Sequence, residues 1–176
     1  ANLYGLALAY KKNNNFNEGL ASLDKLLEKY PKNLVLNTTK VEFLSYFNKF
    51  NDALDLANKF LEISPKNYPL SISKSQILLN MGQYFESEEI IRDQLLRKND
   101  SPELWFMLSE TQKTSQNIVG YHQSRAEYFL LLGQDEKALN QLEFALQLTQ
   151  NNFQVSDRIM TKIIEIKKSL QNSRGL

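Results

Sequence analysis

Apolar residues along the chain recur every three or four positions, which is the spacing of one face of an α-helix. The run Phe16, Leu20, Leu23, Leu27 and Tyr30 shows this spacing clearly. Asn-rich stretches and Met81-Gly82 interrupt the pattern, as turns between helices do. The pattern predicts an all-α chain of about ten antiparallel helices, over residues 2–13, 17–29, 33–47, 51–63, 69–81, 84–97, 102–114, 117–132, 135–149 and 154–171.

The predicted helices repeat in pairs with a period of 34 residues. Pro31-Lys32-Asn33 returns as Pro65-Lys66-Asn67, and the small residues Gly19, Ala53 and Ser87 stand at the same interval. A 34-residue period of two helices is typical of the tetratricopeptide (TPR) repeat. One helical hairpin cannot bury its apolar stripe alone, so neighbouring hairpins stack. The sequence therefore predicts a TPR-type α-solenoid.

The repeat loses its regularity towards the C-terminus. Three regular units cover roughly residues 1–33, 34–67 and 68–100, and an irregular, half-repeat-shifted part covers 101–149. There, Ala138 continues the pattern a period and a half after Ser87, and Tyr121 stands where the fourth unit should carry a small residue. The helix at 117–132 is therefore expected to end one unit and begin the next.

The last predicted helix, 154–171, has an apolar side and a basic side. A repeat array needs a polar outer face at its end, so we expect this helix to cap the array. The prediction is a single TPR domain over residues 1–176. The chain opens without Met and already inside an apolar-periodic stretch, which we interpret as a piece of a longer or processed protein.

The composition disfavours several kinds of chemistry. Lys and Arg number 21 against 20 Asp and Glu, so no excess charge draws the chain to nucleic acid. Cysteine is absent and His122 is the single histidine, which leaves too few ligands for a typical zinc site. No Gly-rich phosphate loop, G-x-S-x-G or H-E-x-x-H motif occurs, and no apolar run approaches the length of a membrane span. We expect a non-enzyme without a cofactor of its own.

Three stretches resemble one TPR family in particular. They are Tyr4-Gly5-Leu6-Ala7-Leu8-Ala9, then Trp105, Leu108-Ser109, Arg125-Ala126-Glu127 and Leu132-Gly133 with Ala138, and finally Arg158-Ile159. Together they resemble the C-terminal TPR domain of periplasmic zinc metalloproteases of the BepA (YfgC) type. The resemblance implies a periplasmic location, a zinc-containing protease domain outside this chain, and a role in outer-membrane protein quality control. The partners it implies are the assembly machinery or its substrates.

Candidate binding residues follow from the repeat register. The first helix of each TPR hairpin faces the inner groove, which puts there Tyr4, Leu8, Lys11, Thr38, Glu42, Ser45, Ile72, Gln76, Leu79, Phe106, Glu110 and Lys113. These residues lack the basic clamp with which some TPR domains grip acidic chaperone tails, and they suit an extended or helical peptide segment. Phe106 is expected to anchor a partner or, alternatively, to fill the core of the irregular fourth unit. Lys59 and Lys137 lie on second helices and face outward, so their substitution is expected to leave partner binding nearly unchanged.

Three functions fit this sequence. The first is a non-catalytic interaction module that binds an external protein in its groove. The second is an autoinhibitory or structural lid on a protease domain of the same polypeptide. The third is a generic TPR adaptor, unrelated to proteolysis, in the cytoplasm. The sequence sets neither the partner nor the oligomeric state.

Overall fold

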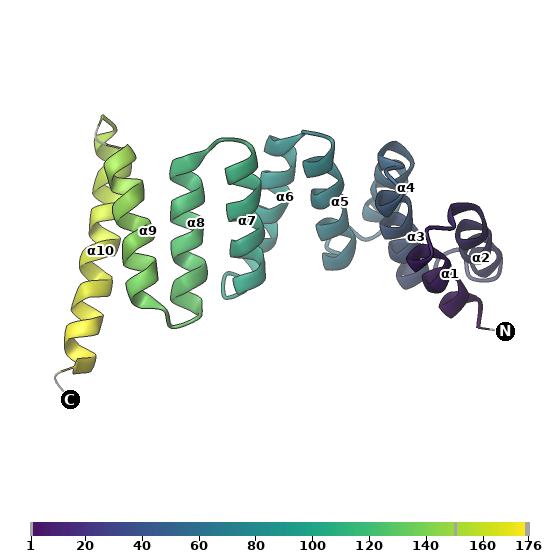
Figure 1. Ribbon diagram of the computed structural model, residues 1–176, viewed down its shortest axis with the longest axis horizontal. Coiled ribbons are helices and arrows are strands. Elements are labelled where there is room, and N and C mark those ends of the chain that lie inside the picture. Colours follow the sequence, from purple (N-terminus) through teal and green to yellow (C-terminus); the bar gives the residue numbers. More distant parts are fainter. Residues whose placement is uncertain (1, 150, 175–176) are drawn as a thin grey trace. The chain divides into compact units, whose positions relative to one another are not determined.

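The computed structural model describes residues 2–149 and 151–174, and within them the chain is helical throughout with no strand (Figure 1). The helices are α1 (Leu3–Lys12), α2 (Phe16–Lys29), α3 (Leu34–Tyr46), α4 (Phe50–Ile63), α5 (Tyr68–Asn80), α6 (Tyr84–Arg97), α7 (Pro102–Thr114), α8 (Ile118–Leu131), α9 (Asp135–Leu148) and α10 (Phe153–Arg174). Each predicted helix is confirmed, with ends that differ by one to three residues or not at all. The chain forms two compact units, Ala1–Ile90 and Ile91–Leu176, and their boundary falls inside α6.

The period of 34 residues appears in the backbone of the turns. Positive φ angles occur at Asn14 (59°), Asn48 (58°), Gly82 (78°) and Gln116 (62°), four positions that follow one another at intervals of 34 residues. Gly133 (68°) lies half a period after the last of them. Asparagine and glycine tolerate this left-handed conformation better than other residues do. The half-period shift predicted for the C-terminal part is therefore present in the turn before α9.

Asparagine or serine side chains cap the starts of α3, α5 and α7, the first helices of the second, third and fourth pairs. Asn33 Oδ1 accepts a hydrogen bond from the Leu36 amide at 3.1 Å, and Asn67 Oδ1 accepts one from the Leu70 amide at 3.0 Å. One period further on, Ser101 caps α7 and Pro102 occupies the first helical position. Such caps satisfy backbone N–H groups that have no partner inside the helix.

Small residues let the helices of the first unit approach closely. A Cβ atom added to Gly19 would lie 2.5 Å from Phe43 Cζ, so α2 and α3 meet where a side chain is missing. Ala53 and Ala57 of α4 are fully buried in the main cluster of this unit. That cluster joins α3, α4 and α5 through Val41, Leu44, Ala53, Ala57, Phe60, Leu70 and Ile77.

In the second unit, α8 packs against α7 on one side and α9 on the other, and α10 packs on α9 (Figure 1). Gly120 faces α7: a Cβ atom there would lie 2.8 Å from Gln112 Nε2. The small residue of the fourth hairpin is therefore Gly120. The fixed period predicts it one position later, at Tyr121. On the other side of α8, Ala126 shares a core cluster with Ala138 of α9. The helix does serve two hairpins, as predicted.

The last helix closes this cluster. Ile159, Ile163 and Ile166 of α10 are buried in it. Arg158 on the basic side is exposed, and Lys162 Nζ lies 2.7 Å from Glu127 Oε1 on α8. The division of α10 into an apolar and a basic side is the one expected of a cap.

Candidate functional site

The candidate residues of the first unit lie along the edges where first helices meet. Tyr4 Oη of α1 lies 3.4 Å from Thr39 Oγ1 of α3. Lys11 Nζ lies 5.0 Å from the centre of the Tyr46 ring, which again joins α1 to α3. From α3 to α5, Ser73 Oγ donates to Glu42 Oε1 at 3.5 Å. The first helices α1, α3 and α5 therefore lie side by side, as the repeat register predicts.

The other candidates of this unit differ in how much surface they present. Leu8 and Gln76 are exposed, whereas Ser45, Ile72 and Leu79 are half-buried. Thr38 is only 9% exposed, and its hydroxyl donates to the Leu34 carbonyl at 2.8 Å. Thr38 therefore offers little surface to a partner, and its neighbour Thr39 is the threonine that lies at the edge beside Tyr4.

In the second unit, the three candidates of α7 all lean on α8. The Phe106 ring lies 5.5 Å from the Tyr128 ring, measured between centres. Glu110 Oε1 lies 3.8 Å from Arg125 Nη1, and Lys113 Nζ lies 5.9 Å from the centre of the Tyr121 ring. Phe106 remains 39% exposed despite its contacts. It is thus a fixed aromatic surface residue with one side packed on α8.

Sequence reasoning missed Arg125, which is the most enclosed cation at these positions. Its guanidinium lies 4.7 Å from the Phe106 ring centre, 5.0 Å from Tyr128 and 5.3 Å from Phe129. Tyr128 and Phe129 follow Arg125 at the three- and four-residue spacing of helix neighbours, which is the signal that could have found them. The contact with Phe106 depends on how α7 and α8 pack, which spacing along the chain does not encode.

We use "first-helix surface" for the accessible side chains of these helices, taken within each unit by itself: Tyr4, Leu8, Lys11, Glu42, Ser45, Tyr46, Ile72, Gln76 and Leu79 in the first unit, and Phe106, Glu110 and Lys113, with Arg125 of α8 packed against Phe106, in the second. Tyr4 also lines an apolar pocket of about 490 Å³ between α1, α2 and α3, together with Tyr30 and Val35. Cations lie against aromatic rings in both units, so this surface presents ring faces and ammonium groups, together with the Gln76 amide.

Three observations concern metal ligands, the histidine and membrane spans in the part of the chain that the structure describes. No group of three His, Asp or Glu side chains there could hold a metal ion. His122 Nδ1 lies 2.8 Å from Gln141 Oε1, and its ring packs against Phe144, so it serves the α8–α9 contact. None of the described helices combines the length and apolar character needed to cross a bilayer.

No protein-family model matches the chain, and no curated protein matches it. Solved structures do share its fold. MamA (residues 41 to end) from Desulfovibrio magneticus RS-1 superposes with a TM-score of 0.65 at 12% identity, over 95% of this chain and 94% of that one. A tetratricopeptide repeat protein from Parabacteroides merdae gives 0.57 at 14% identity, over 93% of this chain and 69% of that one.

A third similar chain comes from the structure of Naa15/Naa10 bound to HypK-THB. Its TM-score is 0.57 at 20% identity, over 97% of this chain and 30% of that one. At such identities the likeness concerns the fold alone. The chain is a TPR-type α-solenoid, as the 34-residue period predicts.

Proposed function

We propose that the chain is a non-catalytic protein–protein interaction module that binds a peptide segment of its partner on the first-helix surface. One observation carries this proposal: two exposed aromatic rings on first helices, those of Tyr46 and Phe106, each lie against a cation. Tyr46 is 53% exposed beneath Lys11, and Phe106 is 39% exposed beneath Arg125. Rigid, accessible aromatic side chains contribute more binding energy than most residues at protein interfaces.

The remaining side chains of the surface define the partner's chemistry. Leu8 adds exposed apolar area on α1, and Gln76 adds an amide on α5. Glu42 accompanies Lys11 in the first unit and Glu110 accompanies Lys113 in the second, so neither part of the surface has a dominant sign of charge. An extended or helical segment with mixed polar and apolar side chains fits it better than a strongly acidic tail. One similar solved structure, the Naa15/Naa10 assembly, is described as bound to a protein, HypK-THB.

Site-specific photocrosslinking tests this proposal. A photoreactive phenylalanine analogue replaces Leu8 or Gln76 on the first helices, or Glu86 or Glu89 on the second helix α6. All four side chains are exposed, so all accept the probe without loss of packing. We expect crosslinks to a protein partner in cells from the first pair and none from the second. Equal crosslinking from both pairs, or none from either, contradicts the proposal.

The finer assignment rests on the sequence resemblance. We infer that the module is the TPR part of a periplasmic metalloprotease of the BepA type, and that it binds outer-membrane assembly machinery or its substrates. The coding sequence ahead of Ala1 tests this directly. A signal peptide followed by H-E-x-x-H supports it, and an upstream sequence with neither contradicts it. Crosslinks that reach only a protease domain of the same polypeptide support the lid function instead.

A further inference from the structure

A second pocket lies away from the first-helix surface, between the two second helices α2 and α4. Its volume is about 420 Å³, within the range of pockets that bind ligands or side chains. Its apolar lining comes from Leu20 of α2, Leu44 of α3 and Leu56 of α4. Leu44 is almost fully buried, whereas Leu20 and Leu56 are half-buried. The pocket therefore offers aliphatic walls from three helices to a side chain that enters it.

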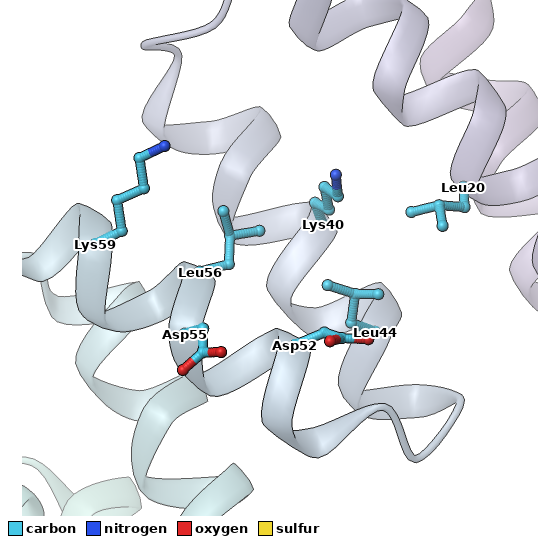
Figure 2. Close-up of a pocket in the computed structure, with 7 residues that line it drawn as sticks. All are labelled: Leu20, Lys40, Leu44, Asp52, Asp55, Leu56 and Lys59. Carbon is cyan, nitrogen blue, oxygen red and sulfur yellow. The ribbon is translucent and has the colours of Figure 1, made fainter.

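Charged side chains surround these leucines, with Lys40, Lys59, Asp52 and Asp55 in the pocket lining. Figure 2 shows the two lysine side chains towards one side of the pocket and the two aspartates towards the other, with Leu44 and Leu56 between them. The charge of Lys40 is already matched, because its Nζ lies 2.6 Å from Asp24 Oδ1. Within the described residues, Asp52, Asp55 and Lys59 form no ion pair.

The unmatched charges favour a basic ligand. Two carboxylates, Asp52 and Asp55, stand against one ammonium group, Lys59, once the Lys40–Asp24 pair is set aside. Asp52 lies in the first turn of α4, where the helix dipole stabilises a carboxylate, so its position has a structural reason. Asp55 lies beyond that turn, one helical turn from Asp52 on the same side of α4. Both carboxylates are exposed, so a cation from outside can reach them.

From this charge pattern we propose that the α2–α4 pocket binds a basic peptide segment of a partner protein. An apolar side chain of that segment enters between Leu20, Leu44 and Leu56, and an adjacent Lys or Arg side chain lies against Asp52 and Asp55. The apolar contact supplies most of the affinity, and the carboxylates select the sign of charge. This surface is separate from the one in the proposed function, because its carboxylates and two of its leucines belong to second helices.

A titration of the full 176-residue chain, labelled with ¹⁵N, tests the proposal. The probe is a capped peptide that carries Leu-Phe followed by two arginines, and the matched probe has two glutamates in their place. We expect saturable amide shifts around Leu20, Leu44 and residues 52–59 with the arginine peptide. The glutamate peptide is expected to bind at least threefold more weakly, a factor in the range expected for exposed ion pairs.

Variants separate the role of the carboxylates from general charge. The double variant Asp52→Asn with Asp55→Asn is expected to bind the arginine peptide roughly three- to tenfold more weakly. The control, Glu28→Gln with Glu62→Gln, removes the same charge from exposed positions on α2 and α4, the two helices on either side of the pocket. It is expected to bind the arginine peptide as the wild type does. Melting curves of both variants check that they fold, and the two peptides on the unmodified chain test the proposal without any variant.

Several results would overturn this proposal. One is the absence of amide shifts at about 2 mM peptide, since a dissociation constant above that concentration is too weak to select a partner. Another is a set of shifts that map outside the pocket, and a third is equal binding of the two peptides. Shifts of the pocket amides that depend on protein concentration without peptide would assign the pocket to a second copy of the chain and also overturn it. Failure of the photocrosslinks at Leu8 and Gln76 leaves this titration unaffected, so the two proposals fail independently.

Discussion

The guanidinium carbon of Arg125 lies 4.7 Å from the centre of the Phe106 ring, so a cation of α8 is stacked against an aromatic residue of α7. Arg125 Nη1 is buried and has no hydrogen-bond acceptor among the described residues. The carboxylate oxygen that pairs with it, Glu110 Oε1, is 3.8 Å away. The ring faces of Phe106, Tyr128 and Phe129 therefore contribute to the electrostatic compensation of this cation, and cation–π contacts are worth from about 0.5 kcal/mol at exposed sites to about 2 kcal/mol where water is excluded.

We predict that Phe106→Leu lowers the free energy of unfolding by about 0.5–2 kcal/mol through loss of the ring quadrupole. Leucine keeps most of the apolar area, so the cost measures the cation–π contact more than the burial. In an Arg125→Met background the same substitution is expected to cost less, because no cation remains above the ring. Urea denaturation of the four proteins gives the coupling energy. A coupling energy near zero would show that Phe106 and Arg125 only pack.

Phe106 links the stability of the fold to partner binding. Phe106→Ala is expected to lower stability by less than the ~3–5 kcal/mol of a fully buried phenylalanine, because the ring is 39% exposed. It is also expected to weaken partner binding by at least ~1 kcal/mol. Melting temperature and partner affinity are measured on the same sample. A large stability loss with unchanged affinity would place Phe106 in the core alone, and no change in either would remove it from the proposed binding surface.

The helices and their period could be predicted from the sequence because both depend on local spacing and turn chemistry. Asn14, Asn48 and Gly82 indicate turns because asparagine and glycine tolerate the left-handed backbone conformation, whatever the tertiary context. The predictions were wrong where packing between helices determines which residue faces the neighbouring helix. Gly120, not Tyr121, approaches α7, although the turn before α8 and the start of α8 both keep the 34-residue period, so the difference lies in how α8 packs on α7. Thr38 is buried, since helix rotation turns Thr39 towards α1 instead.

We predict that Gly19→Ala lowers the free energy of unfolding by about 1–3 kcal/mol, the cost of overpacking a core. The new Cβ would lie 2.5 Å from Phe43 Cζ and 3.2 Å from Tyr10 Cβ, and Phe43 is 1% exposed, so its ring cannot relieve the clash by turning out into solvent. Gly5→Ala is the matched control within α1. Its Cβ meets only the Asn2 side chain, at 3.3 Å, and the higher helix propensity of alanine is expected to stabilise by up to ~1 kcal/mol. Equal effects of the two substitutions would contradict the packing of α2 on α3.

The start of α7 is predicted to carry a pH-dependent contribution to stability. Ser101 Oγ donates to Glu103 Oε2 at 2.8 Å. This hydrogen bond, then the backbone N–H of Glu103 and then the charge of Lys98, lowers the pKa of Glu103 below its ordinary value. Because the unfolded chain binds the proton more readily, the stabilisation is fully present above about pH 5 and is lost as pH falls through the folded-state pKa.

The measurement compares wild type with Glu103→Gln by denaturation between about pH 6 and pH 3. We expect the wild type to be the more stable protein at the upper end, and the difference to shrink towards the lower end. In a Ser101→Ala background the difference is expected to vary less with pH, since the hydrogen bond that contributes most to the lowered pKa is gone. A difference that grows on acidification would mean that folding raises the pKa of Glu103, contrary to this prediction.

The last prediction concerns the buried hydroxyl pair between α5 and α6. Ser75 Oγ lies 2.9 Å from Ser87 Oγ, and Ser87 Oγ also donates to the Ser75 carbonyl at 2.9 Å. Both side chains are essentially inaccessible to water. Ser87 occupies the position that alanine fills one period earlier, at Ala53, so alanine fits there without a new clash. Ser75→Ala and Ser87→Ala are each expected to lower the free energy of unfolding by about 0.5–1.5 kcal/mol, the net value of a hydrogen bond.

The double variant is expected to cost less than the sum of the two single variants, because the hydroxyl–hydroxyl bond is lost only once. In each single variant one buried hydroxyl is left without its partner, which is costly for a polar group. In the double variant no such hydroxyl remains. Ser22→Ala is the control: its hydroxyl, which donates to the Glu18 carbonyl on the surface of α2, is expected to change stability by less than ~0.5 kcal/mol. Urea denaturation of all five proteins decides. Strict additivity of Ser75→Ala and Ser87→Ala would mean that the two serines stabilise the α5–α6 hairpin independently.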